Sequence, residues 1–570
     1  MKLRILAFVC AVALVPVFLA GQGDTQGGLD PATLHKPLAD DWPTYAGDYT
    51  GRRYSQLTQV NQTTVKNLTL AWVSRLNGGF PAAAVAPGRG AGAGFFGGNG
   101  GGNTIVGGVG TGEYTSTNVK GAILKVNDTL YVTSADHVWA IDVRDGREIW
   151  HFAWRTRGGT HTGNRGAAIW HNYLFFETPD DYLVSLDART GRERWHVEIA
   201  SFEQQYFSTA APIVVGNHLI VGTGNDMDAP GFLQSFDPET GKRNWIFYTV
   251  PMNPGDPGLD TWPNLESARH GGGTTWIPGV YDTETKLYIF GTGNPTPSYT
   301  GVSRPGDNLF TCSLIALDVE TGKMKWYFQT SAHDTHDWDS AQTPVLFDAT
   351  INGRPRKLVS TASRNGYFYT LDRVTGQHIV TSRYGQHANW ARDQRTTGVV
   401  EPNPTREAQI AGSLVSPIEQ GVTNWPPAAY SPDTGLFYVQ EKNGYNILYL
   451  TDPDPRGSMG LGGKTVAGVG SGGDFLQALD PTTGKAVWRH PFPSGIAGGG
   501  VGSGALVTAG RVLFFGDGAG NLIGFDATNG TPLWHSRVGN ISNSPQTYMV
   551  DGKQHVLVAV TDTLYAFKLY

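Results

Sequence analysis

Carboxylates and an amide stand beside glycine-rich and histidine-containing runs at three places in the sequence. Residues 333–339 read His-Asp-Thr-His-Asp-Trp-Asp, and the runs VGTGND and GTGN end at Asp226 and Asn294. Hard cations prefer oxygen ligands, and the number of ligand charges tunes their affinity. The chemistry that these residues suggest is therefore cation binding. Taken one at a time, Asp226 and Asn294 are equally typical of turns beside glycine.

The composition excludes several classes of protein. The 570 residues include 76 Gly and 16 Trp, and only 16% are charged, which disfavours both disorder and a long helical protein. The net charge of −6 provides no positive field to hold a nucleic-acid backbone. With only Cys10 and Cys312, the sequence given contains no disulfide framework, cysteine-rich zinc site or CxxCH haem motif. Cys312 lies in a strand pattern and is expected to be buried, so cysteine hydrolase chemistry finds no support.

The first residues predict secretion. A basic start, Met1 to Arg4, precedes an apolar run of 16 residues, 5–20, that ends in small residues. This pattern is typical of a signal peptide, which we assign to residues 1–21. A membrane anchor is the alternative, but the run is shorter than the ~20 residues of a spanning helix. We expect a periplasmic mature protein with no membrane span.

The elements that must position the candidate residues follow from a repeat. Seven runs join an apolar strand, an Asp and a Gly turn, and they end at Trp150, Trp195, Trp245, Trp326, Val380, Trp488 and Trp534. Each run predicts a β-hairpin, and another strand pair precedes it. Four short strands per unit, with the first three Trp residues 45 and 50 residues apart, indicate propeller blades. We expect each Trp to pack between neighbouring blades.

The termini supply the missing blade. The C-terminal tail provides three strands, and residues 67–72 offer the fourth, which would remove open sheet edges. The fold class is therefore all-β, an eight-bladed propeller over residues 40–570 closed by N- and C-terminal strands. Residues 78–115 form a Gly-rich insertion, expected as a loop or lid. Residues 248–272, 294–309, 383–424 and 443–474 are further long excursions, which mark the functional face.

Several motifs together resemble a known family. The segments DWPTY (41–45) and RRYS (52–55), the run GTGNPTP (291–297) and the run HDTHDWD (333–339) occur in the order and blades of quinoprotein alcohol dehydrogenases. The sequence resembles the methanol and ethanol dehydrogenase large subunits of this family over residues 40–570. The resemblance implies pyrroloquinoline quinone (PQQ) and a metal ion at the propeller axis.

The resemblance also implies a metal site. Its positions are Asp226, Asn294 and Asp337, with Asp226 in place of the usual Glu. Asp339 resembles the added ligand of the lanthanide-dependent branch of the family. We favour a lanthanide, with Ca²⁺ as the alternative, because added carboxylates suit a trivalent ion. His333 and His336 are interpreted as loop-packing or polar-network residues.

The family pattern places further residues around the cofactor. Arginine forks suit carboxylates and quinone oxygens, and an aromatic face suits a flat tricyclic ring. The implied cofactor-binding residues are Lys120, Arg165, Thr209, Thr223, Thr274, Trp276, Arg364 and Asn389.

The implied reaction is oxidation of an alcohol by hydride transfer to PQQ. The metal would act as a Lewis acid, Asp337 as the general base and Arg364 as the stabiliser of negative charge. A separate cytochrome c would accept the electrons.

Three departures from the family keep other functions open. Gly159-Thr160 replaces an adjacent-cysteine pair, Gly502 stands where the family has a Trp, and loop lengths differ. A propeller without PQQ that serves as a binding or assembly scaffold is one alternative. A sugar or polyol quinoprotein dehydrogenase is the other, because one fold serves many functions.

Overall fold

The computed structural model describes residues 28–78, 104–112, 117–451, 462–496 and 502–570. The predicted signal peptide, residues 1–21, and most of the predicted Gly-rich insertion lie outside the described residues. No helix in these ranges is long and apolar enough to cross a membrane.

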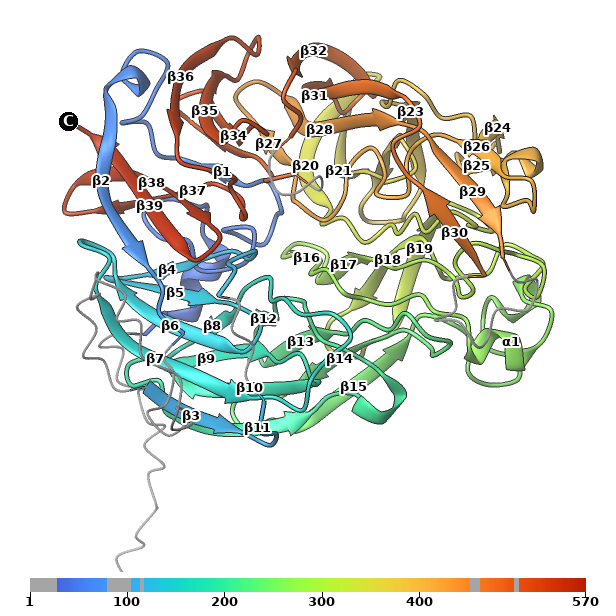
Figure 1. The fold of residues 1–570 in the computed structure, drawn as a ribbon, viewed down its shortest axis with the longest axis horizontal. Coiled ribbons are helices and arrows are strands. Elements are labelled where there is room, and N and C mark those ends of the chain that lie inside the picture. The colour runs from blue at the N-terminus through green and yellow to red at the C-terminus, as the bar shows by residue number, and fades with distance from the viewer. Residues whose placement is uncertain (1–27, 79–103, 113–116, 452–461, 497–501) are drawn as a thin grey trace, which may run out of the picture.

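The fold is all-β and resembles a propeller. Figure 1 shows the sheets following one another around the middle of the molecule, with the red C-terminal strands beside the blue strand β2. Eight sheets in the described ranges each contain four antiparallel strands in a row. In chain order they are β4 (Leu124–Val126), β5 (Thr129–Thr133), β6 (His137–Asp142) and β7 (Glu148–Arg155); β8 (Ala168–Trp170), β9 (Tyr173–Glu177), β10 (Tyr182–Asp187) and β11 (Glu193–Glu198); β12 (Ile213–Val215), β13 (His218–Gly222), β14 (Phe232–Phe236) and β15 (Arg243–Tyr248); β16 (Val280–Asp282), β17 (Leu287–Gly291), β18 (Ser313–Asp318) and β19 (Met324–Gln329). The others are β20 (Val345–Ile351), β21 (Arg354–Ala362), β22 (Tyr367–Asp372) and β23 (His378–Arg383); β27 (Ala429–Ser431), β28 (Leu436–Gly444), β31 (Ser471–Asp480) and β32 (Lys485–Phe492); β33 (Leu506–Thr508), β34 (Val512–Gly516), β35 (Asn521–Asp526) and β36 (Pro532–Arg537); and β2 (Leu68–Arg75), β39 (Thr563–Leu569), β38 (Lys553–Val560) and β37 (Gln546–Val550).

The last of these sheets joins the two ends of the chain. Strand β2 pairs antiparallel with β39, with Leu68 opposite Leu569 and Arg75 opposite Thr563. The sequence predicted this pairing from residues 67–72. Strand β1 (Tyr54–Ser55), also from the N-terminal region, pairs parallel with β33 and so joins the C-terminal sheet of β33 to β36.

The repeated Trp joins each sheet to the next. The indole nitrogen of Trp150 donates a hydrogen bond to Ala188 O (3.1 Å), in the turn between β10 and β11 of the following sheet. Trp195 and Trp245 donate in the same way to Glu239 O (3.0 Å) and Val319 O (2.8 Å). The next turn brings a glycine with positive φ against each ring; for example, a Cβ at Gly191 would lie 2.6 Å from Trp150. The predicted position of Trp between neighbouring units is confirmed.

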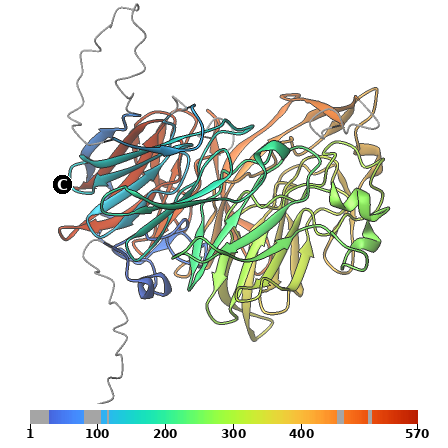
Figure 2. The same cartoon turned by 90° about the horizontal axis from the view of Figure 1, so that it is seen from below.

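The long excursions contain more regular structure than expected. Part of the Gly-rich insertion forms β3 (Thr104–Gly108), which pairs parallel with the outer strand β7. The excursions also contain β24 (Ala391–Gln394), β25 (Val400–Pro402), β26 (Ser413–Val415), β29 (Asn446–Leu450), β30 (Gly463–Val466), the helix α1 (Leu265–Arg269) and 3-10 helices at Leu259–Thr261 and Pro404–Arg406. Further 3-10 helices at Pro31–His35, Val65–Asn67 and Phe202–Gln204 lie outside the excursions. Helix α1 and the hairpin of β29 and β30 lie at one side of the molecule in both views (Figures 1 and 2).

Replacing Trp150 with Ala is expected to lower the free energy of unfolding by about 3–5 kcal/mol, because the side chain is 4% exposed and leaves a cavity between two sheets. Trp150→Phe should cost less, about 1 kcal/mol for the lost hydrogen bond to Ala188. Chemical denaturation measures both values, with Val487→Ala, at a position 55% exposed, as the control. Equal stabilities for Trp150→Ala and the control would show that the indole does not hold the sheets together.

Candidate functional site

Most of the predicted site residues lie at the same ends of the strands. Thr223, Asn294 and Arg364 follow the second strands of their sheets, β13, β17 and β21. Seven other predicted residues precede the first strand of a sheet. They are Lys120 before β4, Arg165 before β8, Thr209 before β12, Thr274 and Trp276 before β16, and Asp337 and Asp339 before β20. The start of one strand and the end of its antiparallel neighbour share an edge, so these residues gather at one end of the sheets.

Arg364 connects two predicted metal ligands. Its Nη1 donates to Asp339 Oδ2 (2.6 Å), and its Nη2 lies 3.5 Å from Asp337 Oδ2. The second oxygen of Asp339 accepts a hydrogen bond from the backbone N–H of Asn294 (2.6 Å). Arg364 and Asp339 are both buried, at 4% and 5% exposure. The structure therefore brings together Asn294, Asp337, Asp339 and Arg364, as the sequence predicted.

Carboxylates outnumber cations at this centre. Burial raises the pKa of Asp337 well above its usual range; Asp339, Glu419 and Asp226 act in the same direction, and Arg364 opposes them. Burial also raises the pKa of Asp339, while Arg364 and the Asn294 N–H lower it. A bound cation would relieve this repulsion, because buried carboxylates are stable only when they are compensated.

The fourth predicted ligand, Asp226, makes a different contact. Its Oδ2 pairs with His161 Nε2, and that hydrogen bond is the main cause of the raised pKa of His161. In the part of the chain that the structure describes, no three His, Cys, Asp or Glu side chains lie close enough together to share a metal ion. The oxygen donors fit a hard cation in kind. To bind the metal, the Asp339 carboxylate would have to give up its contact with Arg364. The Asp226 carboxylate would likewise have to give up its contact with His161.

Arg165 is a partly buried cation that lies over two aromatic rings. Its guanidinium carbon lies 4.6 Å from the ring centre of Trp276 and 5.0 Å from that of Trp425. Nη1 donates to the carbonyl and hydroxyl oxygens of Thr209. Nε has no hydrogen-bond partner among the described residues. No carboxylate of the described chain reaches ion-pair distance.

Lys120 adds a second positive charge here. A Cβ on Gly163 would lie 3.9 Å from Lys120 Nζ, so the ammonium group sits beside the segment that carries Arg165. Burial lowers the pKa of Lys120, and the charge of Arg165 lowers it further. Arg165 and Lys120 have no anionic partner among the described residues and lie beside aromatic rings, which fits a flat ligand that carries several carboxylates.

Three predicted residues make other contacts. Asn389 donates to Leu414 O (3.0 Å) and accepts from the backbone N–H of Ser416 (2.9 Å), so it braces its own loop. The Thr223 hydroxyl contacts Phe207 O at 3.2 Å and Asp181 Oδ1 at 3.3 Å. Thr274 is buried. The described side-chain hydrogen bonds of Asn389 reach neither Arg364 nor Arg165.

The histidines and Cys312 have the surroundings that the sequence predicted. His336 stacks on Trp338, with ring centres 4.4 Å apart, and contacts Arg406 O at 3.1 Å. His333 Nδ1 contacts Gly306 O at 2.8 Å. Cys312 is fully buried, and burial raises the pKa of its thiol.

Sequence reasoning missed Trp425 and Glu419. Trp425 lies outside the repeat, in the run TNWPP, and a buried Trp without a repeat position was the available signal. Glu419 accepts the Thr465 hydroxyl hydrogen bond (2.5 Å), and its backbone carbonyl accepts from Arg364 (3.0 Å). No spacing in the sequence marks Glu419, because it enters the centre from an irregular excursion.

The positions that depart from the family pattern have physical explanations. Gly502 has φ +101°, a backbone conformation that strains any residue with a side chain, and the Gln440 side chain now occupies the space beside its Cα. Gly159 and Thr160 line a cavity of about 490 Å³ together with Phe202 and Tyr206. Gly159 and Thr160 are smaller than the cysteine pair of the family pattern, so the space that the two cysteine side chains would fill stays open in this cavity.

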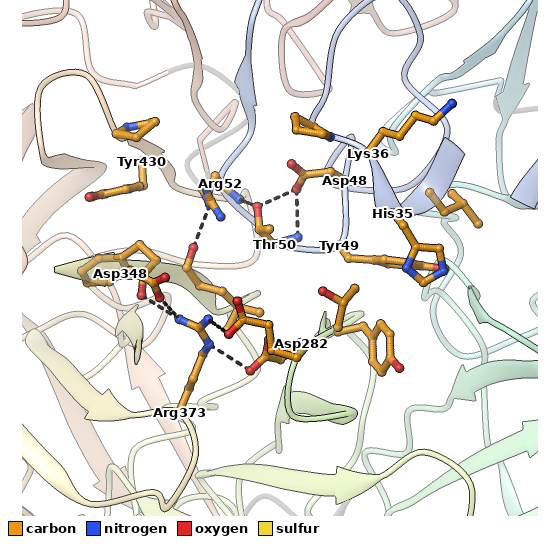
Figure 3. A pocket seen from close by; sticks show the side chains of 18 residues that line it. His35, Lys36, Asp48, Tyr49, Thr50, Arg52, Asp282, Asp348, Arg373 and Tyr430 are labelled. Atoms are coloured by element: carbon orange, nitrogen blue, oxygen red, sulfur yellow. Dashed lines mark hydrogen bonds and ion pairs between the residues drawn. The ribbon is translucent and has the colours of Figure 1, made fainter. Parts of the chain in front are cut away.

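A second cavity, of about 400 Å³, lies away from these residues (Figure 3). It opens at the hairpin after β16, the opposite end of that sheet from Asn294. Figure 3 shows Arg373 between Asp282 and Asp348, and its Nε donates to Asp282 Oδ2 at 2.9 Å. No predicted site residue lines this cavity, and carboxylates already neutralise its Arg373.

Comparison with known proteins decides the family. The PQQ family model for the beta-propeller domain of glucose, ethanol and alcohol dehydrogenases matches residues 42–386. The chain belongs to the PQQ-dependent alcohol dehydrogenase family. A second model, described as outer membrane protein assembly factor BamB, matches residues 471–569. The resemblance inferred from the motifs is confirmed.

Relatives of this quinoprotein family match most of the chain. The quinohemoprotein alcohol dehydrogenase of Comamonas testosteroni is 32% identical over 91% of this chain and 72% of its own length. Its crystal structure covers 96% of this chain and 83% of its own, with a TM-score of 0.81 and 29% identity. The quinoprotein alcohol dehydrogenase PedH of Pseudomonas putida is 34% identical over 63% of this chain, and the match spans 64% of PedH, slightly under two thirds. A europium-containing methanol dehydrogenase has a TM-score of 0.78 and 25% identity, and covers 94% of this chain and 99% of its own. These relatives are named as oxidoreductases.

Replacing Arg364 with Met should lower the free energy of unfolding of the metal-free protein by roughly 3–5 kcal/mol, because the buried Asp339 and the partly buried Asp337 lose their guanidinium. Added La³⁺ should stabilise this variant more than the wild type, since the ion replaces the lost positive charge. Urea unfolding with and without La³⁺ measures both effects. Arg395→Met, which removes a distant partner of Asp307 and Glu401, is the control. No response of Arg364→Met to La³⁺ beyond that of the control would contradict a cation site at these carboxylates.

Proposed function

We propose that this protein is a PQQ- and metal-dependent dehydrogenase that oxidises an alcohol to an aldehyde or ketone. One observation carries the proposal. One end of the sheets holds a partly buried cation, Arg165, with no carboxylate at ion-pair distance among the described residues, and a group of carboxylates in excess over their cation, Arg364. An anionic ring cofactor and a metal ion would neutralise the two groups together. Membership of the PQQ family supports the same combination of an anionic ring cofactor and a metal ion.

We propose further that the sheets form an eight-bladed propeller closed by β2 and β39. Eight sheets of four antiparallel strands and the pairing of the two chain ends support this ring. If β2 and β39 close the ring, no unpaired sheet edge remains where the two chain ends meet. The closed ring would also fix the positions of the strand ends that carry the site.

The residues that would hold PQQ surround Arg165. Trp276 and Trp425 offer ring faces, while Arg165, Lys120 and Thr209 offer groups for carboxylates and carbonyl oxygens. When bound, PQQ supplies the acceptor for a hydride from the alcohol carbon. Thr274, beside Trp276 in the chain, lies at the same strand ends.

Asp337 is the proposed general base. Arg364 lies against Oδ2 of Asp337, which leaves Oδ1 to take the proton of the substrate hydroxyl. Arg364 has a second role, because its fixed positive charge stabilises negative charge that develops beside it during hydride transfer. Arg364 is buried and the Asp337 side chain is 25% exposed, so these charges interact in a less polar medium than bulk water.

The proposed metal ligands are Asp226, Asn294, Asp337 and Asp339. We favour a lanthanide, with Ca²⁺ as the alternative, since a trivalent ion compensates more of the excess negative charge. The similarity to a europium-containing methanol dehydrogenase supports this choice.

We also propose a periplasmic location and a separate cytochrome c as electron acceptor. The basic, apolar start of the sequence supports export. A relative from Thauera butanivorans named 1-butanol dehydrogenase (cytochrome c), 29% identical over 91% of this chain, supports the acceptor.

Reconstitution tests the proposed function. The purified protein, combined with PQQ and either La³⁺ or Ca²⁺, should bind the cofactor and oxidise primary alcohols with an artificial dye. Asp337→Asn should lower kcat by roughly 10²–10⁴-fold, because the proton has no base, while PQQ binding is kept. Asp348→Asn, at a carboxylate near the opposite cavity, is the matched control. Full activity of Asp337→Asn would contradict the mechanism, and a wild type that binds no PQQ with either metal would contradict the function.

Replacing Asp339 with Ala distinguishes the two metals. Loss of this carboxylate should weaken La³⁺ binding by roughly 10–100-fold, while Ca²⁺ binding changes less, because the lost charge matters more to a trivalent ion. Competition of La³⁺ against a luminescent lanthanide measures the affinity without turnover. An unchanged La³⁺ affinity would exclude Asp339 as a ligand.

A further inference from the structure

Asp337, the proposed general base, has a backbone conformation that residues with a side chain rarely adopt. Its φ is +63°, in the left-handed region. A residue other than glycine is uncommon in this region, and such a conformation persists only where the surrounding structure holds it. Because the direction of the Asp337 carboxylate depends on this turn, the contacts that hold the turn also orient the proposed base.

Asp334 makes contacts on both sides of this turn. Its Oδ2 accepts hydrogen bonds from the backbone N–H of His336 (3.3 Å) and from that of Trp338 (3.1 Å), the two neighbours of Asp337 in sequence. Asp side chains commonly hold a nearby turn of their own backbone in this way. Asp334 is 3% exposed, so bulk water has little access to these hydrogen bonds. A single carboxylate oxygen therefore closes the turn in which Asp337 lies.

Arg304 fixes Asp334 against the neighbouring loop. Its Nη2 donates to the backbone carbonyls of Asp334 (2.5 Å) and Pro297 (2.7 Å). Nε also donates to Pro297 O (3.2 Å), and Nη1 donates to Asn308 Oδ1 (2.7 Å). Pro297 follows the proposed metal ligand Asn294 by three residues. One guanidinium, on a residue that is 1% exposed, thus joins the two loops that carry proposed metal ligands.

Trp338 anchors the far end of the turn. Its indole is 0% exposed and stacks on His336, with ring centres 4.4 Å apart. The indole nitrogen donates to Ile418 O (3.1 Å), and the carbonyl of the next residue, Glu419, accepts a hydrogen bond from Arg364. The segment around the proposed base is therefore held at both ends, which is the support that a precisely oriented group requires.

We propose that Asp334 is the positioning residue for the general base. Its carboxylate holds the left-handed turn of Asp337, and Arg304 fixes the Asp334 backbone relative to the loop of Asn294. Both residues act through Asp337 and not on the reacting atoms. The inference rests on the proposed function, because it assumes that Asp337 is a base and a metal ligand. The effect on the rate comes from orientation, since a displacement of about 1 Å costs about 10²-fold.

Two substitutions of Asp334 test its effect on turnover. In the protein reconstituted with PQQ and La³⁺, Asp334→Ala should lower kcat by roughly 10²-fold with little change in KM, because the base loses its orientation while the substrate still binds. Asp334→Asn should restore most of kcat, since its amide oxygen can accept from the same two N–H groups. Asp282→Ala, which removes a buried carboxylate that accepts a backbone N–H beside the opposite cavity, is the matched control.

Europium luminescence provides a measurement that does not depend on turnover. Lifetimes in H₂O and in D₂O count the water molecules bound to Eu³⁺. The ion in Asp334→Ala should carry one more water than in the wild type, because the Asp337 carboxylate no longer reaches it. Asp334→Asn and Asp282→Ala should keep the wild-type count. A role of Asp334 in stability alone would leave the count of the folded variant unchanged, and that result would overturn the inference.

Arg304→Lys tests the connection between the two loops. One ammonium group lacks the fork that bridges the carbonyls of Asp334 and Pro297. Both kcat and the number of bound waters should therefore change in the same direction as in Asp334→Ala, and by less. Arg373→Lys, at a buried guanidinium beside the opposite cavity, is the control and should behave as the wild type. This pair also serves as the test where Asp334→Ala does not fold.

A crystal structure of metal-free Asp334→Ala tests the turn without PQQ or an ion. The φ of Asp337 should leave the left-handed region, because the two N–H groups beside it have lost their shared acceptor. Asp337 that keeps φ near +63° in this variant, or Asp334→Asn that is as impaired as Asp334→Ala, would overturn the inference and leave the proposed function intact. A wild type that binds neither PQQ nor Eu³⁺ would overturn the proposed function, and with it the role of Asp334 in the reaction.

Discussion

The contact between each repeated Trp and the next sheet is the interaction on which the site depends. The site residues come from segments that belong to several different sheets, so no sheet contains the chemistry alone. Five of the repeated indoles each cover a glycine in a turn of the next sheet and donate to a carbonyl there, as Trp150 does to Ala188. They are Trp150, Trp195, Trp245, Trp326 and Trp488. These contacts lie near the outer strands, yet they fix the angles between sheets and thereby the distances between the strand ends. A rigid scaffold with irregular loops at one end is a common way to build a binding site.

Unbalanced buried charge is the second constraint. Folding leaves Arg165 partly buried without an acid at ion-pair distance in the described chain. It also brings the buried Asp339 and the partly buried Asp337 together, with Glu419 nearby and a single guanidinium between them. Such an arrangement costs stability in the empty protein. The cost is consistent with a protein whose folded state is completed by an anionic cofactor and a cation. Stability that rises when a ligand binds follows from the same linkage.

The repeat made much of the fold predictable. The Asp, Gly and Trp of each turn are local signals, and they correctly placed the hairpins, the inter-sheet Trp positions and the pairing of residues 67–72 with the tail. The irregular parts were less predictable. Strand β3 arises in a Gly-rich stretch because the exposed edge of β7 accepts it, a tertiary effect with no local pattern.

In the candidate site too, the residues carried by sequence motifs were predictable and the others were not. Residues carried by motifs, such as Asn294, Asp337, Asp339 and Arg364, come together as predicted. Asn389 was chosen from a short Asn-Trp match, and it braces Leu414 and Ser416 instead. Trp425 and Glu419 were missed because their roles depend on which segments of other sheets they face, and single-sequence spacing carries no such information.

Crystallography of the protein with PQQ and La³⁺, using anomalous scattering, tests the central claim most directly. The account predicts one lanthanum peak among Asp226, Asn294, Asp337 and Asp339, with the quinone ring on Trp276 and a carboxylate on Arg165. A lanthanum ion elsewhere, or a ring bound away from Arg165, would contradict it.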